Sequence, residues 1–304
     1  MLAKFDYLGF MAQFNRHITD IQELHTRVKY YAATHEFIQQ HNASNKSSVA
    51  GHNQFSDWSP AEYKHMLGYV AEESHVRNEV WLDASNTSPI DWRSEGGVTG
   101  VKDQGQCGSC WAFATIAGFE TAQFVANGTL LSFAEQQIVD CSGNAYFNFG
   151  CNGGMAERAY NYMAASDGTA LEADYPYTSG TTGTKSSSGC LGAGQPITSH
   201  KATSSVEVTK NDPDQLKAAL AIGAVTVGIE ADTMYFQTYQ SGILDDASAC
   251  GTTLDHAVTA VGWGVDSDSN TEYWIIKNSW SSTWGEDGYV RMAIVDGIGI
   301  CGVQ

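Results

Sequence analysis

The distribution of cysteines constrains the fold of this chain more than any other feature of its sequence. The chain has 304 residues and seven cysteines, all of which lie between positions 107 and 301. An odd number predicts three disulfide bridges and one free thiol, although six cysteines can pair in 15 ways. Three bridges would mean that the chain folds in an oxidising compartment.

One cysteine stands in a setting that favours reactivity. Cys110 lies where a turn rich in glycine and serine, residues 104–109, runs into an apolar segment that is predicted to be helical as far as Ala126. A thiol at a helix N-terminus lies beside unpaired N–H groups and the positive end of the helix dipole, which favour the thiolate. Far downstream, His256 provides a base and Asn278 an amide that can orient it. A lone buried cysteine is usually inert, but this combination predicts a cysteine protease.

The composition divides the chain near residue 85. Residues 1–84 carry seven Lys or Arg and ten Asp or Glu, whereas residues 85–304 carry nine and 24. Seven of the nine histidines lie in the first part, and all of the cysteines lie in the second. We therefore expect two units, one over residues 1–84 and one over residues 85–304.

The first unit has a helical pattern. Apolar and aromatic residues recur at steps of three and four over residues 10–40, which predicts two helices separated near Asp20. Residues 51–57 indicate a short strand and a turn. A further helix is predicted to start at Ser59, and residues 80–88 indicate an extended linker.

The second unit combines helices with strands. After the helix that follows Cys110, a second helix is predicted over residues 132–140, with Ser132 and Glu135 spaced as a capping box. A connector rich in Gly, Ser and Thr covers residues 178–205. Alternating apolar runs then predict strands at 225–229, 257–261, 273–276 and 288–292.

These patterns predict two lobes within the second unit. The helical lobe would cover about residues 97–198, and the β lobe would cover about residues 199–304 together with 85–96. A cleft between the lobes would have the nucleophile on one wall and the base on the other.

Charge and composition exclude several function classes. The net charge of −18 argues against a nucleic-acid partner and against anionic membrane surfaces, because both require a basic footprint. No apolar run approaches 18 residues, so we expect no membrane span. We also expect no cofactor and no metal ion.

Short motifs occur in a characteristic order at residues 90–93, 104–111, 150–154, 175–177, 255–257, 278–280 and 284–286. With these motifs the chain resembles the papain-like cysteine proteases, and within them the cathepsin L group. His256 follows Cys110 by 146 residues, inside the spacing of that family, and Asn278 follows it by 168, somewhat beyond.

The resemblance implies an α+β fold of two lobes, a helical left lobe and a β-barrel-like right lobe, and it assigns catalytic roles. Cys110 would attack the peptide carbonyl as a thiolate, and His256 would hold the partner proton and give it to the leaving amine. Asn278 would orient the imidazole, and Trp280 would shield that contact. The side-chain amide of Gln104 and the N–H of Cys110 would form the oxyanion hole. The implied bridges are Cys107–Cys151, Cys141–Cys190 and Cys250–Cys301.

Residues 1–84 resemble the inhibitory propeptide of the same family, which implies a zymogen. The residues that match its two motifs are Glu23, Arg27, Tyr31, Ile38 and Asn42, and then Gly51, Asn53, Phe55 and Asp57. Thr34 departs from the first motif, where Asn is usual. The propeptide would end in the extended linker through the cleft, with the maturation cut near residues 80–88.

The resemblance also implies a substrate pocket. The substrate backbone would pair with Gly153 and Gly154, next to Asp255. The S2 pocket would use Met155, Ala156, Gly228, Leu254 and Ala257. These side chains are apolar and mostly small, so we expect a bulky apolar P2 residue, and Gly228 widens the pocket where relatives carry Ala or Val. Acceptance of a basic P2 residue stays an open alternative, because in relatives the residue at the floor of S2 lies beyond the position that corresponds to Gln304.

The histidines of residues 1–84 suggest activation by acid. Imidazoles titrate between pH 5 and 8, and an imidazole that is buried neutral opposes folding once it is protonated. His52, inside the second propeptide motif, is the first candidate. Two alternative functions remain: a catalytically silent binding protein on the same scaffold, and an acyl transferase or ligase that uses the same thioester.

The expected setting is an acidic one. We expect a monomer in a lysosome or other acidic vacuole, or after secretion, with protein and peptide substrates and cystatin-type inhibitors as partners. The first 20 residues lack the continuous apolar core of a signal peptide. The sequons compatible with secretion are those of Asn42, Asn45, Asn86 and Asn127.

Overall fold

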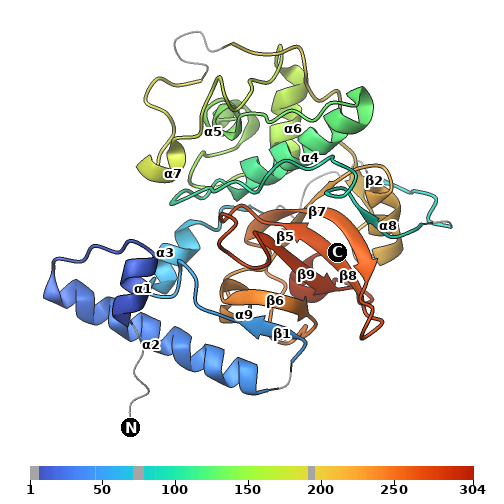
Figure 1. Cartoon of the computed structure of the whole chain (residues 1–304). Coiled ribbons are helices and arrows are strands. Elements are labelled where there is room, and N and C mark those ends of the chain that lie inside the picture. Colours follow the sequence, from blue (N-terminus) through green and yellow to red (C-terminus); the bar gives the residue numbers. More distant parts are fainter. Residues whose placement is uncertain (1–6, 45, 71–78, 86, 191–195) are drawn as a thin grey trace.

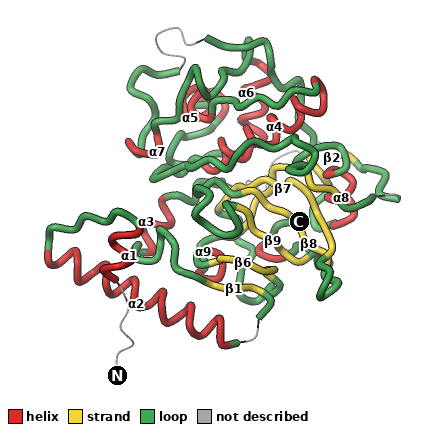
Figure 2. Tube along the Cα trace, in the orientation of Figure 1, coloured by secondary structure: helices red, strands yellow, loops and turns green. Residues whose placement is uncertain are grey.

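The computed structural model of the chain describes residues 7–44, 46–70, 79–85, 87–190 and 196–304. Figure 1 shows an upper lobe of helices, a lower lobe built around a β-sheet, and a helical N-terminal unit beside the sheet lobe. Figure 2 shows the same division by secondary structure, with the strands gathered in the lower lobe. None of the helices in the described ranges is both long and apolar enough to cross a membrane.

Three helices lie in the described residues of the N-terminal unit. They are α1 (Tyr7–Gln13), α2 (Ile21–Ala43) and α3 (Pro60–His65). The predicted break near Asp20 is confirmed, because the Asp20 carboxylate accepts the first free N–H groups of α2. The ring of Tyr31 lies 5.1 Å from that of Tyr7 and 4.9 Å from that of Phe10, so aromatic packing holds α1 against α2.

The start of α3 is also as predicted. The Ser59 hydroxyl accepts the N–H of Glu62, and the Glu62 carboxylate accepts the N–H of Ser59, which completes a capping box. The strand predicted at residues 51–57 is wrong: the strand β1 (Ser48–Ala50) lies just before it. Residues 53–56 turn instead, because the Asn53 side chain accepts the N–H of Phe55 and draws the chain out of an extended conformation.

The helical lobe is built on one buried helix. Its elements are α4 (Cys110–Asn127), α5 (Glu135–Cys141), η1 (Asn144–Tyr146), α6 (Ala156–Ala165) and α7 (Ser179–Thr182). The alanine-rich α4 ends at Gly128, whose φ of 71° is the left-handed conformation that glycine adopts at little cost. Helix α4 packs against α6 within its own lobe and against strands of the other lobe, so it positions the residues at its start relative to both.

The predicted capping box of the second helix is wrong. Helix α5 begins at Glu135 with Ala134 as its N-cap and no side-chain cap, so Ser132 plays no part. Glu135 is buried and pairs with Lys102 at 2.6 Å, because a buried carboxylate gains more from a cation than from a backbone N–H.

A mixed sheet forms the β lobe. Its strands run in the order β1, β6, β9, β8, β7 and β3, with β5 also paired to β7. Their bounds are β3 (Ile90–Asp91), β5 (Val225–Ile229), β6 (Tyr239–Leu244), β7 (His256–Val265), β8 (Glu272–Lys277) and β9 (Tyr289–Ala293). The four strands expected from alternating runs are therefore present. The expected barrel is an open sheet, since its end strands β1 and β3 do not pair with one another in the described part of the chain.

Three short elements complete this lobe, namely α8 (Pro213–Leu220), α9 (Met234–Gln237) and η3 (Ile300–Gly302). Helix α8 packs on β7. The fully buried side chains of Trp274 and Trp284 lie in the hydrophobic core of this lobe.

The N-terminal unit contributes a strand to this sheet. Strand β1 pairs with β6 antiparallel, as the outermost strand. Further along, β2 (Glu79–Val80) pairs in parallel with β4 (Glu207–Val208), and the Gln215 side chain binds both backbone groups of Leu82. Residues 79–82 are thus fastened to the β lobe, in the linker expected over residues 80–88.

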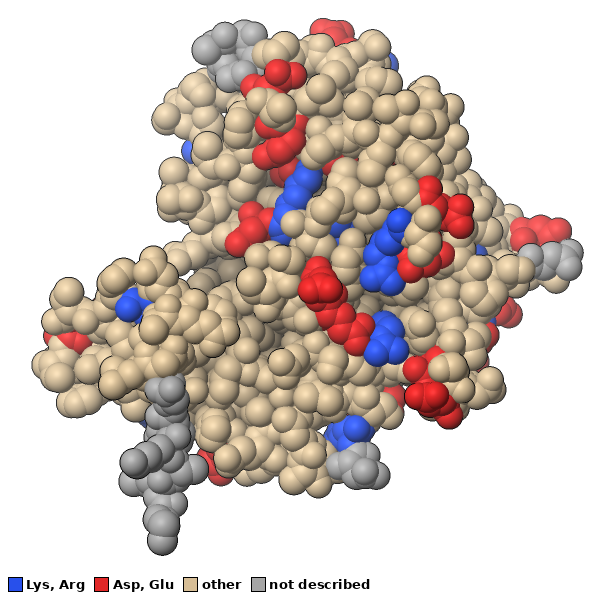
Figure 3. All heavy atoms as spheres, viewed as in Figure 1, with Lys and Arg blue, Asp and Glu red and all other residues tan. Residues whose placement is uncertain are grey.

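Three disulfides are present, two in the helical lobe and one in the β lobe. They join Cys107 to Cys151, Cys141 to Cys190, and Cys250 to Cys301. Cys110 is the free thiol that the odd count predicts, and it is fully buried. On the face drawn in Figure 3, acidic side chains lie beside basic ones, and the basic ones do not merge into a large patch.

Candidate active site

Cys110 is the first residue of helix α4 and lies between the two lobes. Its Sγ accepts two backbone N–H groups, one from Gly68 at 3.3 Å and one from Ala257 at 3.4 Å. Gly68 belongs to the N-terminal unit and Ala257 to strand β7. The thiol is therefore enclosed by three separate parts of the chain.

His256 and Asn278 lie together because β7 and β8 are neighbours. His256 begins β7, Asn278 follows the last residue of β8, and the two strands pair antiparallel. The Nε2 atom of His256 lies 2.9 Å from Oδ1 of Asn278, and its ring stacks on Trp280 with centroids 4.7 Å apart. The Nδ1 atom of His256 is buried and has no hydrogen-bond partner among the described residues.

Gln104 presents a fixed donor beside the thiol. Its Oε1 accepts hydrogen bonds from Ser279 Oγ at 2.7 Å and from Trp280 Nε1 at 3.1 Å, which fixes the direction of the amide. Its Nε2 donates to the carbonyl oxygens of Cys107 at 2.9 Å and of Met66 at 2.8 Å. The Met66 carbonyl oxygen thus takes up the Gln104 N–H donor that the oxyanion of a reaction intermediate would need.

The N-terminal unit passes through the cleft as an extended strand. Gly154 donates to the carbonyl of Gly68 at 2.8 Å and accepts the N–H of Val70 at 3.1 Å. The N–H of Tyr69 donates to the carbonyl of Asp255 at 2.9 Å. Within this segment, Cys110 therefore faces the N–H group of Gly68.

Glycines allow this close approach of two backbones. A Cβ on Gly68 would lie 1.9 Å from the carbonyl oxygen of Gly108. Gly153 has a φ of 109°, and a Cβ there would lie 2.9 Å from the carbonyl oxygen of Gly68. Any side chain at these positions would separate the strands.

The ring of Tyr69 enters the pocket expected to bind the P2 side chain. Its Cε1 lies 3.0 Å from where a Cβ of Gly228 would be, and Leu254 lies 3.2 Å from the same point. Ala257, also expected in this pocket, belongs to the same apolar cluster as Tyr69. Met155 and Ala156 are buried at the start of α6. No sequence pattern pointed to Tyr69, because its role depends on the path of the backbone that brings its ring beside Gly228.

Burial holds the catalytic pair in its neutral form. It raises the pKa of the Cys110 thiol to about 11, and the N–H groups of Ala257 and Gly68 only partly oppose this. Burial likewise lowers the pKa of His256 to about 4, although the hydrogen bond that its Nε2 donates to Asn278 acts in the opposite direction. The thiolate expected from the helix N-terminus is therefore not the resting state here, because the covering segment removes water from both groups.

The neighbouring carboxylate is also perturbed. Burial raises the pKa of Asp255 to about 6, with further contributions from the charges of Asp232 and Glu230. Its Oδ1 accepts the N–H of Ala231 at 2.8 Å, which fixes its side chain against the end of β5.

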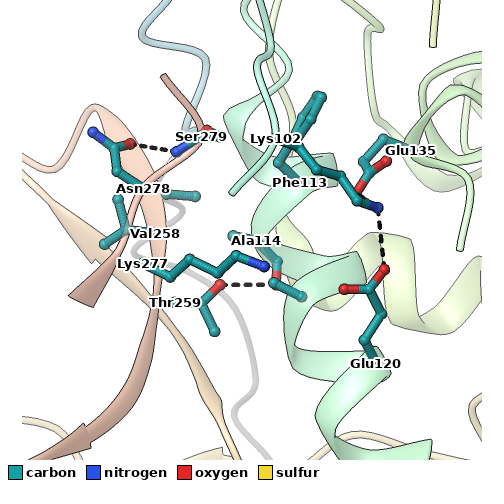
Figure 4. Close-up of a pocket in the computed structure, with 12 residues that line it drawn as sticks. Lys102, Phe113, Ala114, Glu120, Glu135, Val258, Thr259, Lys277, Asn278 and Ser279 are labelled. Atoms are coloured by element: carbon teal, nitrogen blue, oxygen red, sulfur yellow. Dashed lines mark hydrogen bonds and ion pairs between the residues drawn. The ribbon is translucent and has the colours of Figure 1, made fainter. Parts of the chain in front are cut away.

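Behind the site, four charged side chains line a pocket between α4 and the sheet (Figure 4). Lys102 pairs with Glu120 at 3.1 Å and with Glu135 at 2.6 Å. Lys277, the residue before Asn278, donates to the carbonyl of Thr99 at 2.9 Å. Burial lowers the pKa of Lys277 to about 8. Sequence reasoning missed this group, although Glu120 inside an otherwise apolar helix was a signal for a buried partner.

The first propeptide motif stabilises the N-terminal unit. Arg27 donates to Glu62 at 2.7 Å and lies 3.6 Å from Glu23, while Ile38 is buried. Both amide atoms of Asn42 bind the backbone of Ala50 at 2.9 Å, so α2 and β1 are fastened together.

The second motif joins that unit to the β lobe. The N–H of Gly51 donates to the carbonyl of Thr238, and Asn53 Nδ2 donates to the carbonyl of Gln237 at 2.7 Å. Phe55 packs edge-on against Trp280, with ring centroids 5.1 Å apart. Asp57 is buried beneath, where it accepts the Tyr7 hydroxyl at 3.1 Å and pairs with Arg16 at 3.2 Å.

Two of the four candidate glycosylation sites can be compared. Asn127 is exposed at the end of α4, whereas the amide of Asn42 is engaged with Ala50. Asn45 and Asn86 lie outside the described residues. Within the described ranges, no group of three or more His, Cys, Asp or Glu side chains could hold a metal ion.

Comparison with known proteins agrees with this geometry. Residues 86–304 match the family model described as "Papain family cysteine protease", and residues 7–63 match "Cathepsin propeptide inhibitor domain". The chain is 36% identical over 291 residues to "Digestive cysteine proteinase 1" of Homarus americanus, covering 93% of this chain and 88% of that protein.

Two solved structures are similar over nearly the whole chain. A recombinant stem bromelain precursor has a TM-score of 0.85 and 35% identity, and the match covers 98% of this chain and 94% of the other. Digestive procathepsin L 3 of the Tenebrio molitor larval midgut has a TM-score of 0.82 and 30% identity, with coverage of 98% and 95%. Both are precursor forms.

Replacing Gly68 should expose the thiol. We expect Gly68→Ala to raise the rate at which a small thiol reagent labels Cys110 at neutral pH by about tenfold, because overpacking costs on the order of 1–3 kcal/mol. The rate is measured by mass spectrometry on the intact chain. Gly100→Ala is the control, since a Cβ there meets nothing within 4 Å. Equal labelling of Gly68→Ala and the parent chain would contradict this interpretation.

Proposed function

The chain belongs to the papain family of cysteine proteases as a cathepsin L-like zymogen, and we propose that residues 85–304 are its peptidase and residues 1–84 its inhibitory propeptide. The observation that carries the proposal is double occupation of the reaction centre. The N–H of Gly68 donates to the Cys110 thiol, and the carbonyl of Met66 accepts from the Gln104 amide. One segment thereby covers both the nucleophile and the oxyanion donor.

Once that segment leaves, the mechanism follows from the neutral pair. Solvent access favours transfer of the thiol proton to Nδ1 of His256, and Cys110 attacks the carbonyl carbon of the substrate as a thiolate. The new oxyanion takes the place of the Met66 carbonyl on Gln104, a donor whose removal costs roughly 3 kcal/mol of barrier. The Asn278 oxygen holds the imidazole in place through Nε2.

Collapse of the intermediate breaks the C–N bond, and the imidazolium of His256 gives its proton to the leaving amine. Water then attacks the thioester with His256 as base, which releases the acid and restores the thiol. An amine acceptor in place of water would make the same thioester a route to ligation, and a silent scaffold would make no thioester at all.

Acid conversion of the purified chain tests this function. At about pH 4.5 with thiol, we expect a fragment that corresponds to residues 85–304 and hydrolysis of a Phe-Arg or Leu-Arg amide reporter. Both should be lost in Cys110→Ala. Conversion without hydrolysis of the reporter would point to a different P2 preference, and the absence of both would favour a silent scaffold. An amide product formed in preference to the acid when an amine is added would favour the ligase.

We propose that the P2 pocket accepts large apolar side chains, including aromatic ones. Tyr69 supports this, because its ring packs against the bare backbone of Gly228 and beside Leu254. Substrate backbone would replace the segment on Gly153 and Gly154 and bring its own P2 side chain into the space that Tyr69 leaves.

Gly228→Val should narrow that pocket. The new side chain begins 3.0 Å from the position of the aromatic ring. We expect the ratio of kcat/KM for P2 Phe over P2 Leu substrates to fall about tenfold, the usual size of a steric effect in an apolar pocket. Gly223→Ala is the matched control, because a Cβ there meets nothing within 4 Å. A ratio that does not change would contradict the assignment.

A pair of histidines supports activation by acid. The Nε2 of His52 lies 3.0 Å from Nδ1 of His35, and the Gln39 amide nitrogen lies 2.9 Å from Nε2 of His35. When Gln39 donates, His35 must donate in turn to His52, whose own proton is then on Nδ1. That Nδ1 is buried without a partner among the described residues. A further proton can enter only at a nitrogen that already accepts, so it breaks the chain of hydrogen bonds.

The ring of His52 packs against other aromatic rings. His52 stacks on Tyr31 at 4.3 Å between centroids and meets Phe10 of α1 edge-on at 6.3 Å. Asp57 of the same unit is engaged by Tyr7 and Arg16. Burial, and then the charge of His35, lower the pKa of His52 to about 4.

The sign of the effect follows from these values. The unfolded propeptide takes up a proton near pH 6.5, whereas folded His52 takes it up only near pH 4. The stability that neutral His52 contributes to the folded propeptide is therefore fully present above pH 6.5 and is lost as the pH falls toward 4. His52→Gln should move the midpoint of acid conversion to lower pH. His25→Gln, at an exposed position of α2, should leave it in place, and coincident midpoints for all three chains would contradict the role of His52.

We propose the remaining partners and location on physical grounds. The three disulfides support folding in an oxidising compartment, and the lowered pKa of buried His52 supports work in a lysosome or other acidic vacuole, or after secretion into an acidic medium. The mature cleft would also accept cystatin-type inhibitors, and the protein would act as a monomer.

A further inference from the structure

The contact between Gly68 and Cys110 divides the cleft into two sides. Residues 69–70 bind Gly154 and fill the pocket at Gly228, which the proposed function assigns to the acyl side of the substrate. Residues 63–66 lie on the other side of Cys110. The leaving amine and the residues attached to it must therefore occupy the space that residues 63–66 hold in the zymogen.

One cation of the propeptide is bound on that leaving-group side. The ammonium of Lys64 lies 2.7 Å from Oδ2 of Asp232. The residue before it, Tyr63, donates its hydroxyl to the carbonyl of Ala231 at 2.9 Å. Hydrogen bonding to Asp232 raises the pKa of Lys64, and the charges of Asp255 and Glu230 add to the effect. The propeptide thus contacts two successive residues of the wall with two of its own.

Asp232 is held close to the catalytic base. Strand β5 pairs with β7 so that Ile229 lies opposite His256. Just beyond, the N–H of Ala231 donates to the side chain of Asp255, the residue before His256. Asp232 follows directly, and its side chain keeps 26% of its surface exposed even beneath the propeptide. Removal of residues 1–84 takes away its cation and leaves the carboxylate open to solvent.

We propose that Asp232 gives the mature protease a preference for lysine or arginine on the leaving-group side of the scissile bond, at the site that Lys64 occupies in the zymogen. This inference rests on the proposed function. A substrate cation there restores the ion pair that is lost with the propeptide, and it also relieves repulsion among Asp232, Glu230 and Asp255. Because the site is partly exposed, we expect a preference of about fivefold or less, and one that salt weakens.

Paired peptides measure this preference. They share the same acyl side with P2 Phe and differ only in the first three residues after the scissile bond, which carry one Lys, Gln or Glu at each position in turn. For at least one position, we expect the mature enzyme to cleave the Lys peptide with a kcat/KM three to five times that of the Gln peptide at low salt. Asp232→Asn should bring this ratio close to one, and Asp232→Lys should favour Glu.

Asp246→Asn is the matched control. Asp246 also pairs with a propeptide lysine, Lys46, and is also uncovered on maturation, but it follows β6 and contacts the loop between α2 and β1. It should leave the ratio unchanged. Equal Lys-to-Gln ratios in the parent enzyme and Asp232→Asn at all three positions would overturn the inference while the proposed function stands. Failure of the mature enzyme to cleave any of the peptides would overturn both.

Discussion

The indole ring of Trp280 connects the base, the oxyanion donor and the propeptide of this zymogen. One face stacks on His256, its Nε1 donates to the oxygen of Gln104, and the rings of Phe55 and Tyr63 pack on it edge-on at 5.1 and 5.6 Å. The ring therefore orders the catalytic groups and at the same time provides the apolar surface that the propeptide covers. Burial of two aromatic side chains there stabilises the inhibited state by several kcal/mol, about 1.5–3 kcal/mol for each ring.

Inhibition has a steric and an electrostatic part. The steric part is the backbone of residues 66–70, which lies too close to the cleft for any residue but glycine at Gly68. The electrostatic part is the loss of water around Cys110 and His256, which moves both pKa values away from those that an ion pair needs. In the proposed mechanism, departure of the same segment reverses both parts, so that uncovering the site also charges the nucleophile.

The sequence predicted what depends on neighbouring residues and missed what depends on distant ones. Cys110 could be placed at a helix start because the turn before it and the alanine-rich run after it are local signals, and the strands of the β lobe followed from alternation. The predicted cap of α5 failed because Glu135 is drawn to Lys102, 33 positions away. The thiolate at Cys110 was expected from the helix end alone, and only the burial by a segment 42 positions earlier reverses it. No sequence pattern marked Tyr69 or Asp232, because each acts through contacts with residues that are distant in the sequence.

Strand β1 and the fastened residues 79–82 hold the propeptide to the peptidase at both ends of its path. While the chain is intact, the inhibitory segment is present at a fixed and high effective concentration, so a segment that dissociates briefly in acid returns as soon as the pH rises. After the chain is cut between residue 82 and the peptidase, rebinding of the propeptide becomes bimolecular and weakens on dilution. The pH then decides when the cleft first opens, and the volume into which the freed propeptide diffuses decides whether it stays open.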